Sequence, residues 1–224
     1  MNPQAASIEF AENPEPRCAC VLLLDTSGSM GGTPIQELNA SLGEFKNALA
    51  KDSQASARVE VAMVTFGEGG VKVAQEFVSA GDFTPAPLVA GGSTPLGEAL
   101  NKALDLVADR KATYKANAID YYRPWIILIT DGAPTDSGAW EGAAARLRAE
   151  ESRKGVLCWC FGVDNAETGV LKQIAPERSY LLQEYAGSFG KIFRWVSSSM
   201  ARVSQSTPGD QVPLEPPPGP VITS

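Results

Sequence analysis

Residues 21–30, Val-Leu-Leu-Leu-Asp-Thr-Ser-Gly-Ser-Met, constrain the fold more than any other stretch, because four apolar residues end abruptly in Asp25. Continuous apolar runs of this kind are typical of strands that are covered on both faces of a sheet. Ser27 and Ser29 follow the carboxylate at alternate positions around Gly28. The loop after this strand therefore presents one carboxylate and two hydroxyls, which are the hard oxygen ligands that Mg²⁺ and Ca²⁺ take.

Strand and helix patterns alternate along the chain, which predicts a doubly wound α/β sheet with helices on both faces. Strands are expected over residues 18–24, 58–66, 71–78, 125–130, 156–163 and 179–182. Helices are expected over residues 33–51, 96–107, 140–147, 167–174 and 187–203. The turn at residues 67–70 is too short to join parallel strands, so one edge of the otherwise parallel sheet should be an antiparallel hairpin.

A single domain over residues 18–203 is expected, with residues 1–17 as an N-terminal extension. Residues 204–224 contain six prolines and almost no large apolar side chains, so they are predicted to form a disordered, partly polyproline-like tail. Residues 112–123 are polar and irregular, and are predicted to form an exposed excursion. Its tyrosines, Tyr114, Tyr121 and Tyr122, could equally serve packing or contact with a partner.

The charge and the absence of apolar segments narrow the functional classes. The net charge is −7 and no basic run appears, which argues against binding to nucleic acid. No apolar run approaches the length of a membrane span. Residues 1–20 carry Glu9, Glu12 and Glu15 and lack the apolar core of a signal peptide, so a cytoplasmic protein is expected.

The chain contains no histidine, which excludes Ser-His-Asp and Cys-His catalytic groups and histidine-containing zinc sites within it. The four cysteines form two Cys-x-Cys pairs, Cys18 with Cys20 and Cys158 with Cys160, each within a predicted strand. Reduced cysteines that pack in the core are the favoured interpretation. A shared Cys₄ zinc site would require the two strands to be neighbours.

Three loops carry oxygen ligands to positions where α/β sheets bind ligands, beyond the carboxyl ends of the strands. The first holds Asp25, Ser27 and Ser29; Thr94 lies just before a predicted helix, and Asp131 directly follows a second buried strand. Together they offer two carboxylates and three hydroxyls, a near-complete oxygen shell for an octahedral divalent ion. The nearby Asp136 and Ser137 are interpreted as helix N-caps rather than as ligands.

These five residues, in this order, resemble the von Willebrand factor A (vWA) domain with its metal-ion-dependent adhesion site (MIDAS). The resemblance implies the strand order 3-2-1-4-5-6, which would place the strands of the two cysteine pairs two apart, roughly 9 to 10 Å. It further implies that Ser27, Ser29 and Thr94 touch the metal directly, whereas Asp25 and Asp131 act largely through water. Mg²⁺ is the expected ion, with Mn²⁺ and Ca²⁺ as alternatives, and its open position would accept an Asp or Glu of a partner protein.

Within this family, the run of residues 24–35 and the runs of residues 93–100 and 123–136 resemble the bacterial tellurite-resistance-associated TerY type. The resemblance implies a non-enzymatic intracellular binding module of a stress-response, tellurite-resistance or defence system, with a co-encoded kinase or phosphatase as a candidate partner. One alternative is a substrate adaptor for an AAA-type ATPase. A metal-dependent hydrolase or phosphatase is disfavoured, because a nucleophilic Asp25 would need a second carboxylate where Ser27 stands.

Overall fold

The computed structural model describes residue 10 and residues 13–223 of the 224-residue chain. Its centre is a six-stranded sheet in the order β3-β2-β1-β4-β5-β6, in which only the β2–β3 pair is antiparallel. This confirms the predicted fold class, including the hairpin at one edge. The strands are β1 (Cys18–Thr26), β2 (Val59–Gly67), β3 (Gly70–Ser79), β4 (Trp125–Thr130), β5 (Leu157–Val163) and β6 (Ser179–Leu182).

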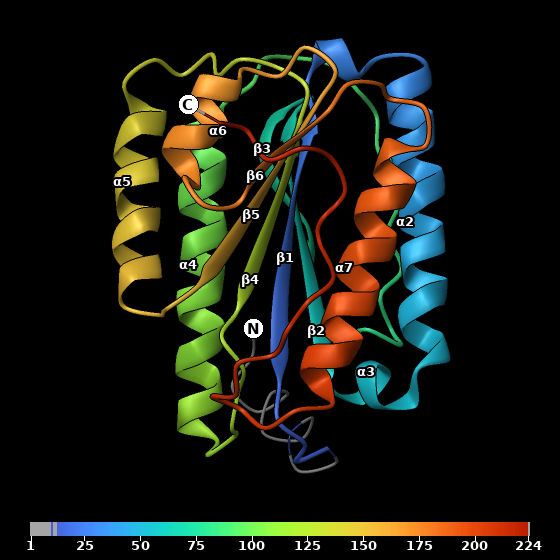
Figure 1. The fold of residues 1–224 in the computed structure, drawn as a ribbon, viewed down its shortest axis with the longest axis vertical. Helices are drawn as coiled ribbons and strands as arrows, with labels where there is room; N and C mark the ends of the chain where they lie inside the picture. Colours follow the sequence, from blue (N-terminus) through green and yellow to red (C-terminus); the bar gives the residue numbers. More distant parts are fainter. Residues whose placement is uncertain (1–9, 11–12, 224) are drawn as a thin grey trace.

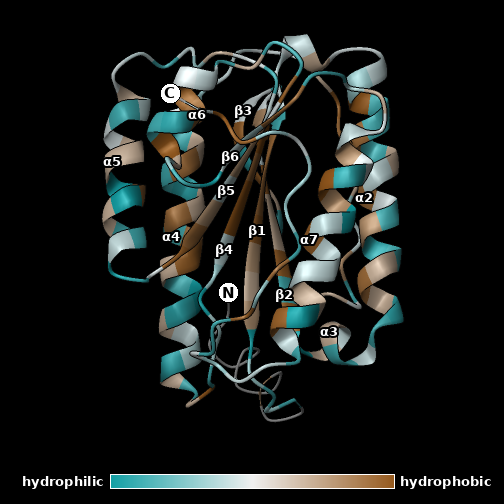
Figure 2. Ribbon diagram, viewed as in Figure 1, coloured by the Kyte–Doolittle hydropathy of each residue, from teal (hydrophilic) through white to brown (hydrophobic). Residues whose placement is uncertain are grey.

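Helices cover both faces of the sheet, and each face has its own apolar core. The helices are α2 (Thr33–Lys51), α3 (Ser53–Arg58), α4 (Leu96–Ala116), α5 (Ala139–Ser152), α6 (Thr168–Ile174) and α7 (Ser188–Ser204). Figure 1 shows α4, α5 and α6 on one side of the sheet and α2, α3 and α7 on the other. The strands between these layers are largely apolar in Figure 2, as expected for strands buried on both faces.

The two cysteine pairs lie on opposite faces of the sheet. Cys18 and Cys20 belong to the core under α2 and α7, whereas Cys158 and Cys160 belong to the core under α4 and α5. Strand β4 also separates the two strands that carry them. All four thiols are buried and free, so the sheet keeps the two pairs apart and they act as small apolar core residues.

The region predicted as an exposed excursion is partly helical and buried. Helix α4 continues to Ala116, and the side chain of Tyr114 is fully buried. Its hydroxyl donates to the carboxylate of Glu60 on β2, which also accepts two hydrogen bonds from Arg110, each 2.7 Å long. Arg17 Nε lies 3.0 Å from the same carboxylate. The polar pattern was misleading here because these polar side chains satisfy one another inside the core.

The proline-rich tail lies against the domain, which differs from the disorder predicted for it. Leu181 N donates to Pro220 O, and Ile222 N donates to Ser179 O, so the tail pairs with the outer edge of β6. The indole nitrogen of Trp195 on α7 donates to Glu215 O. An edge strand presents unpaired backbone groups, and a segment poor in apolar side chains can still pair with them. Composition therefore underestimates the order of this tail.

None of the helices in the described part of the chain is long and apolar enough to cross a lipid bilayer.

Candidate metal centre

Two of the three predicted ligand loops lie side by side because their strands are neighbours. β1 and β4 pair in parallel, with Leu24 opposite Ile129, so their carboxyl ends reach the same edge of the sheet. Asp25 lies near the end of β1, and Ser29 lies in the single 3₁₀ turn that follows it, Gly28–Met30. Asp131 directly follows β4. The sheet topology thus brings together residues that are separated by about half the chain.

Ser29 joins the two loops through hydrogen bonds. Its hydroxyl donates to Asp131 Oδ1 at 2.7 Å and lies 3.0 Å from the hydroxyl of Ser27. Ser27 and Asp131 are buried, whereas Ser29 is exposed. Three of the five predicted ligands therefore form a continuous row of oxygen atoms that opens to solvent at Ser29.

Glycines allow the loop that carries Thr94 to approach the loop after β1. Gly92 has a φ of 75°, in the left-handed region, and a Cβ there would lie 2.4 Å from Gly67 O. Gly67, with a φ of 145°, would in turn place a Cβ 2.2 Å from the carbonyl carbon of Thr26. This close packing lets Gly28 N donate to Gly92 O and Gly91 N donate to Thr26 O. Only glycine suits both positions.

At its φ of 75°, Gly92 turns the chain toward Thr94, which is buried at the start of α4. Thr135 fixes this loop from the other side: Thr94 N donates to Thr135 Oγ1, and Thr135 N donates to Thr94 O, both at 2.9 Å. A Cβ built on Gly132 would lie 3.7 Å from Thr94 Oγ1 and 3.7 Å from Ser29 Oγ. The Thr94 hydroxyl therefore faces the same small space as the Ser29 hydroxyl.

Asp25 is fully buried and already accepts hydrogen bonds from the protein. Its Oδ1 accepts from Ser27 N at 2.8 Å, and its Oδ2 accepts from the hydroxyl of Thr130 at 2.5 Å. Burial raises the pKa of Asp25 to about 6, although the hydrogen bonds from Ser27 and Thr130 oppose this rise, and the charge of Asp131 adds to it. A carboxylate held in this way is suited to support a site through water rather than by direct contact.

Two residues beside the site were not identified from the sequence. Thr130 orients Asp25, and its position directly before Asp131 was the only available signal. Tyr185, in the loop between β6 and α7, donates its hydroxyl to Asp131 Oδ2 at 2.7 Å. Burial, followed by the hydrogen bond to Asp131, raises the pKa of Tyr185 well above its usual value, so the phenol stays protonated and remains a donor. No sequence motif links Tyr185 to the three loops.

Asp136 caps a helix, and that helix is α4 rather than α5, the next helix in the sequence. Its Oδ2 accepts from Gly97 N at 2.7 Å and from Glu98 N at 3.2 Å, which are both in the first turn of α4. Helix α5, which follows Asp136 in the sequence, instead has Gly138 at its N-cap. The interpretation of Asp136 as a cap rather than a ligand agrees with these bonds, and the capped helix is the one that starts beside Thr94.

The donor set fits a hard divalent cation. Two carboxylates and three hydroxyls supply only oxygen, and no Lys or Arg of the described residues forms an ion pair with Asp25 or Asp131. In the described part of the chain, no group of three or more His, Cys, Asp or Glu side chains is placed so that it could hold a metal ion. Hydroxyl ligands are therefore essential to any metal site here, and the two buried acids supply negative charge that a cation would balance.

Several solved structures share this fold. The pilus adhesin SpaC from Lactobacillus rhamnosus GG in its open conformation superimposes with a TM-score of 0.64 at 15% identity, over 85% of this chain and 31% of the adhesin. Proximal thread matrix protein 1 from the mussel byssus gives 0.57 at 19% identity, over 84% and 49% of the two chains. The manganese-loaded TRAP protein of Plasmodium vivax gives 0.52 at 19% identity, over 79% and 73%.

The chain spans about half or less of the length of the mussel and Lactobacillus structures. The comparison with curated proteins gives no significant match. The family model of the von Willebrand factor type A domain, however, matches residues 20–194, which is most of the chain and includes all three ligand loops. With the strand order and the loop arrangement described above, this match shows that the chain belongs to the von Willebrand factor type A domain family.

Proposed function

We propose that this domain is a non-enzymatic, metal-dependent protein-binding module. Ser27, Ser29 and Thr94 would hold Mg²⁺ directly, and Asp25 and Asp131 would hold it largely through water. A bound Mg²⁺ supplies an electrophilic position that can accept a carboxylate. The chain's own residues position the ligands, supply balancing negative charge and leave one side open to solvent at Ser29.

The observation that carries this proposal is the row of hydroxyl and carboxylate oxygens through Ser27, Ser29 and Asp131. These atoms come from two loops whose strands are adjacent, and the close packing of Gly92 on Gly67 brings the loop of Thr94 beside them. A structural role as turn caps would explain each hydroxyl singly. It would not explain why they converge beside two buried carboxylates that have no cationic partner among the described residues.

An enzyme is the less favoured alternative. Without histidine, a general acid or base would have to be a carboxylate, Lys or Tyr. Asp25 lies at full burial, with both oxygens engaged by Ser27 and Thr130, so it is poorly placed for nucleophilic attack. Tyr185 is hydrogen-bonded to Asp131 and keeps its proton. Each of these groups is better suited to orienting ligands than to attacking a substrate.

The biological setting is proposed from sequence resemblance. The motifs around Asp25, Thr94 and Asp131 resemble the TerY type, which favours a bacterial intracellular stress-response, tellurite-resistance or defence complex. The partner would supply an Asp or Glu, and a co-encoded kinase or phosphatase is the first candidate. An adaptor for an AAA-type ATPase would use the same metal-bridged contact. The fold is also shared with pilus adhesins, so adhesion outside the cell is a further setting for the same chemistry.

Metal binding is tested first, by titrating Mg²⁺ and Mn²⁺ into the purified chain in a calorimeter. Thr94→Ala should abolish binding because it removes a hydroxyl ligand. Thr113→Ala is the matched control: this threonine is on α4, the helix that follows Thr94, and its hydroxyl donates to Asp109 O at 2.9 Å within that helix. If Mg²⁺ and Mn²⁺ fail to bind the folded wild-type chain, the proposed site is wrong.

Partner binding is tested next, by capture experiments with candidate partners in Mg²⁺ and in EDTA. Binding should require Mg²⁺, fail with Thr94→Ala, persist with Thr113→Ala, and be lost when the partner's bridging Asp or Glu is replaced. Capture that survives EDTA and Thr94→Ala would refute a metal bridge. Steady turnover of a phosphate ester that disappears with Asp25→Ala would instead support an enzyme.

A further inference from the structure

A cleft lies at the amino ends of the strands, at the opposite end of the domain from the candidate metal centre. Its volume is about 920 Å³, which is within the usual range for sites that bind small molecules. The walls come from the last turns of α4, from residues 121–125 before β4, from the end of α5 and from residues 209–214 of the tail. Because the first three of these segments lead into β4 and β5, the cleft faces the amino ends of the strands, about 20 Å from the carboxyl ends.

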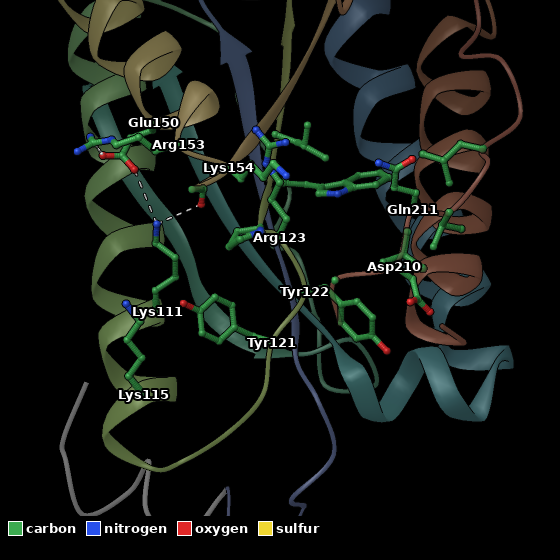
Figure 3. A pocket seen from close by; sticks show the side chains of 18 residues that line it. Lys111, Lys115, Tyr121, Tyr122, Arg123, Glu150, Arg153, Lys154, Asp210 and Gln211 are labelled. Carbon is green, nitrogen blue, oxygen red and sulfur yellow. Dashed lines mark hydrogen bonds and ion pairs between the residues drawn. The ribbon is translucent and has the colours of Figure 1, made fainter. Parts of the chain in front are cut away.

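The cleft is strongly basic in an acidic chain. Five of the 19 lysines and arginines line it, against two of the 26 acidic residues, so the lining carries a charge of about +3 while the whole chain carries −7. The basic residues are Lys111, Lys115, Arg123, Arg153 and Lys154. Figure 3 shows Lys111 and Lys115 on α4 at one side of the opening and Asp210 and Gln211 of the tail at the other, with Tyr121 and Arg123 between them.

The acidic residues of the cleft do not neutralise it. Glu150 pairs with Arg153 at 2.5 Å and lies 3.9 Å from Lys111 Nζ, which donates to Gly155 O. Asp210 instead accepts from Thr207 N and so closes its own turn. Among the described residues, no carboxylate pairs with Lys115 or Lys154. Two exposed ammonium groups therefore remain available at the opening.

The remaining cations are crowded together. The pKa of Lys111 is lowered, first by burial and then by the charges of Lys115 and Arg153, and only Glu150 opposes this change. Arg123 donates to the carbonyls of Val156 and Glu151, both at 2.7 Å, and no carboxylate of the described residues forms an ion pair with it. An anion in the cleft would relieve this repulsion.

Favourable positions at helix ends explain only part of this concentration of cations in the cleft. Lys115 lies in the last turn of α4, where a cation interacts favourably with the helix dipole. Lys154 lies just beyond α5 with a φ of 58°, at a position where helices usually have glycine. Dipole effects at two separate helix ends do not require both sets of cations to face one cavity. Convergence on a shared cavity indicates a ligand that contacts both.

We propose that this cleft binds a small molecule that carries a chain of two or more phosphate groups. Lys111 and Lys115 on α4 would contact one end of the chain, and Arg153 and Lys154 would contact the other, because the two exposed ammonium groups that lack a carboxylate partner among the described residues, Lys115 and Lys154, lie at the ends of different helices. The half-buried ring of Tyr121 also lines the cleft and packs on Tyr114 at 5.3 Å, so it offers a flat surface to a base. A nucleotide and an inorganic polyphosphate share the recognised chemistry.

The test is calorimetric titration of the full chain with inorganic triphosphate, ATP and inorganic phosphate, all in EDTA so that the metal centre plays no part. The double variant Lys115→Gln/Lys154→Gln should bind triphosphate and ATP about tenfold or more weakly, since it loses charge-assisted hydrogen bonds. The matched control, Lys51→Gln/Lys102→Gln, removes two exposed lysines outside the cleft and should bind as the wild type does.

Tighter binding of ATP than of triphosphate, with the difference removed by Tyr121→Ala, would support a nucleotide as the ligand. Equal or tighter binding of triphosphate would support an inorganic polyphosphate. The proposal is overturned if neither compound binds, if inorganic phosphate binds as tightly as triphosphate, or if the control variant loses as much affinity as the double variant.

Discussion

The buried carboxylate of Glu60 should contribute more to stability than any surface ion pair of the chain. Glu60 and Arg17 have no exposed surface, and Arg110 is only 3% exposed. Replacing Glu60 with Gln removes the negative charge that faces both guanidinium groups. Removing one partner of a buried pair costs about 3 to 5 kcal/mol, because the remaining charge is left uncompensated in the core.

The structure places the expected loss near the lower end of that range. Arg17 keeps hydrogen bonds to the carbonyls of Ala57 and Asn13, at 2.9 and 2.7 Å, and Gln keeps the shape of Glu60. We therefore expect Glu60→Gln to lower the free energy of unfolding by about 3 kcal/mol, a large part of the 5 to 15 kcal/mol of a typical domain.

Urea unfolding followed by circular dichroism measures this loss, provided that the m-value is unchanged. The matched control is Glu68→Gln, which breaks a pair with Lys72 whose side chains are both 52% exposed. That variant should lose less than about 0.5 kcal/mol, because exposed pairs are screened by solvent. A loss below about 1 kcal/mol for Glu60→Gln would refute the argument that this buried charge is compensated mainly by its ion pairs.

Three further predictions concern the loops, the tail and the thiols. Gly92→Ala should abolish Mg²⁺ binding in calorimetry, because its Cβ would meet Gly67 O. The control Gly142→Ala, on the open face of α5, should retain Mg²⁺ binding, and binding by Gly92→Ala would contradict the proposed loop packing. Truncation after residue 206 should shift tryptophan emission to the red and increase acrylamide quenching, because Trp195 loses its cover and its bond to Glu215; unchanged quenching would contradict the docked tail. Burial raises the pKa of Cys18 from 9.0 to about 12, so native protein should resist iodoacetamide at pH 9 while urea-unfolded protein reacts. The stability linked to this thiol should fall as the pH rises from 9 toward 12. Rapid labelling of Cys18 in the native protein would contradict its burial.

The sequence alone determined the alternation of elements, the hairpin at the sheet edge and the three oxygen-bearing loops. These features depend on local patterns: apolar runs that end at Asp25 and Asp131, and a turn too short for a parallel connection. Such patterns can be recognised in the sequence because backbone geometry and the burial of both sheet faces act over a few residues at a time.

Other features depended on contacts between distant segments. Glu60 on β2 is a charged residue that the core accepts only because Arg17 reaches it from the segment before β1, and Arg110 and Tyr114 reach it from α4. Tyr185 meets Asp131 through the placement of the loop before α7, and no local pattern predicts that contact.

The proline-rich tail and the basic cleft also depend on contacts between segments that are distant in the sequence. The tail is ordered by the free edge of β6, and it then forms one wall of a cavity whose cations are scattered between Lys111 and Lys154 in the sequence. Local patterns therefore determined which elements form and where oxygen ligands follow strands. Only the tertiary structure decided which charges meet, because the cost of burying a polar group depends on the partners that the fold brings to it.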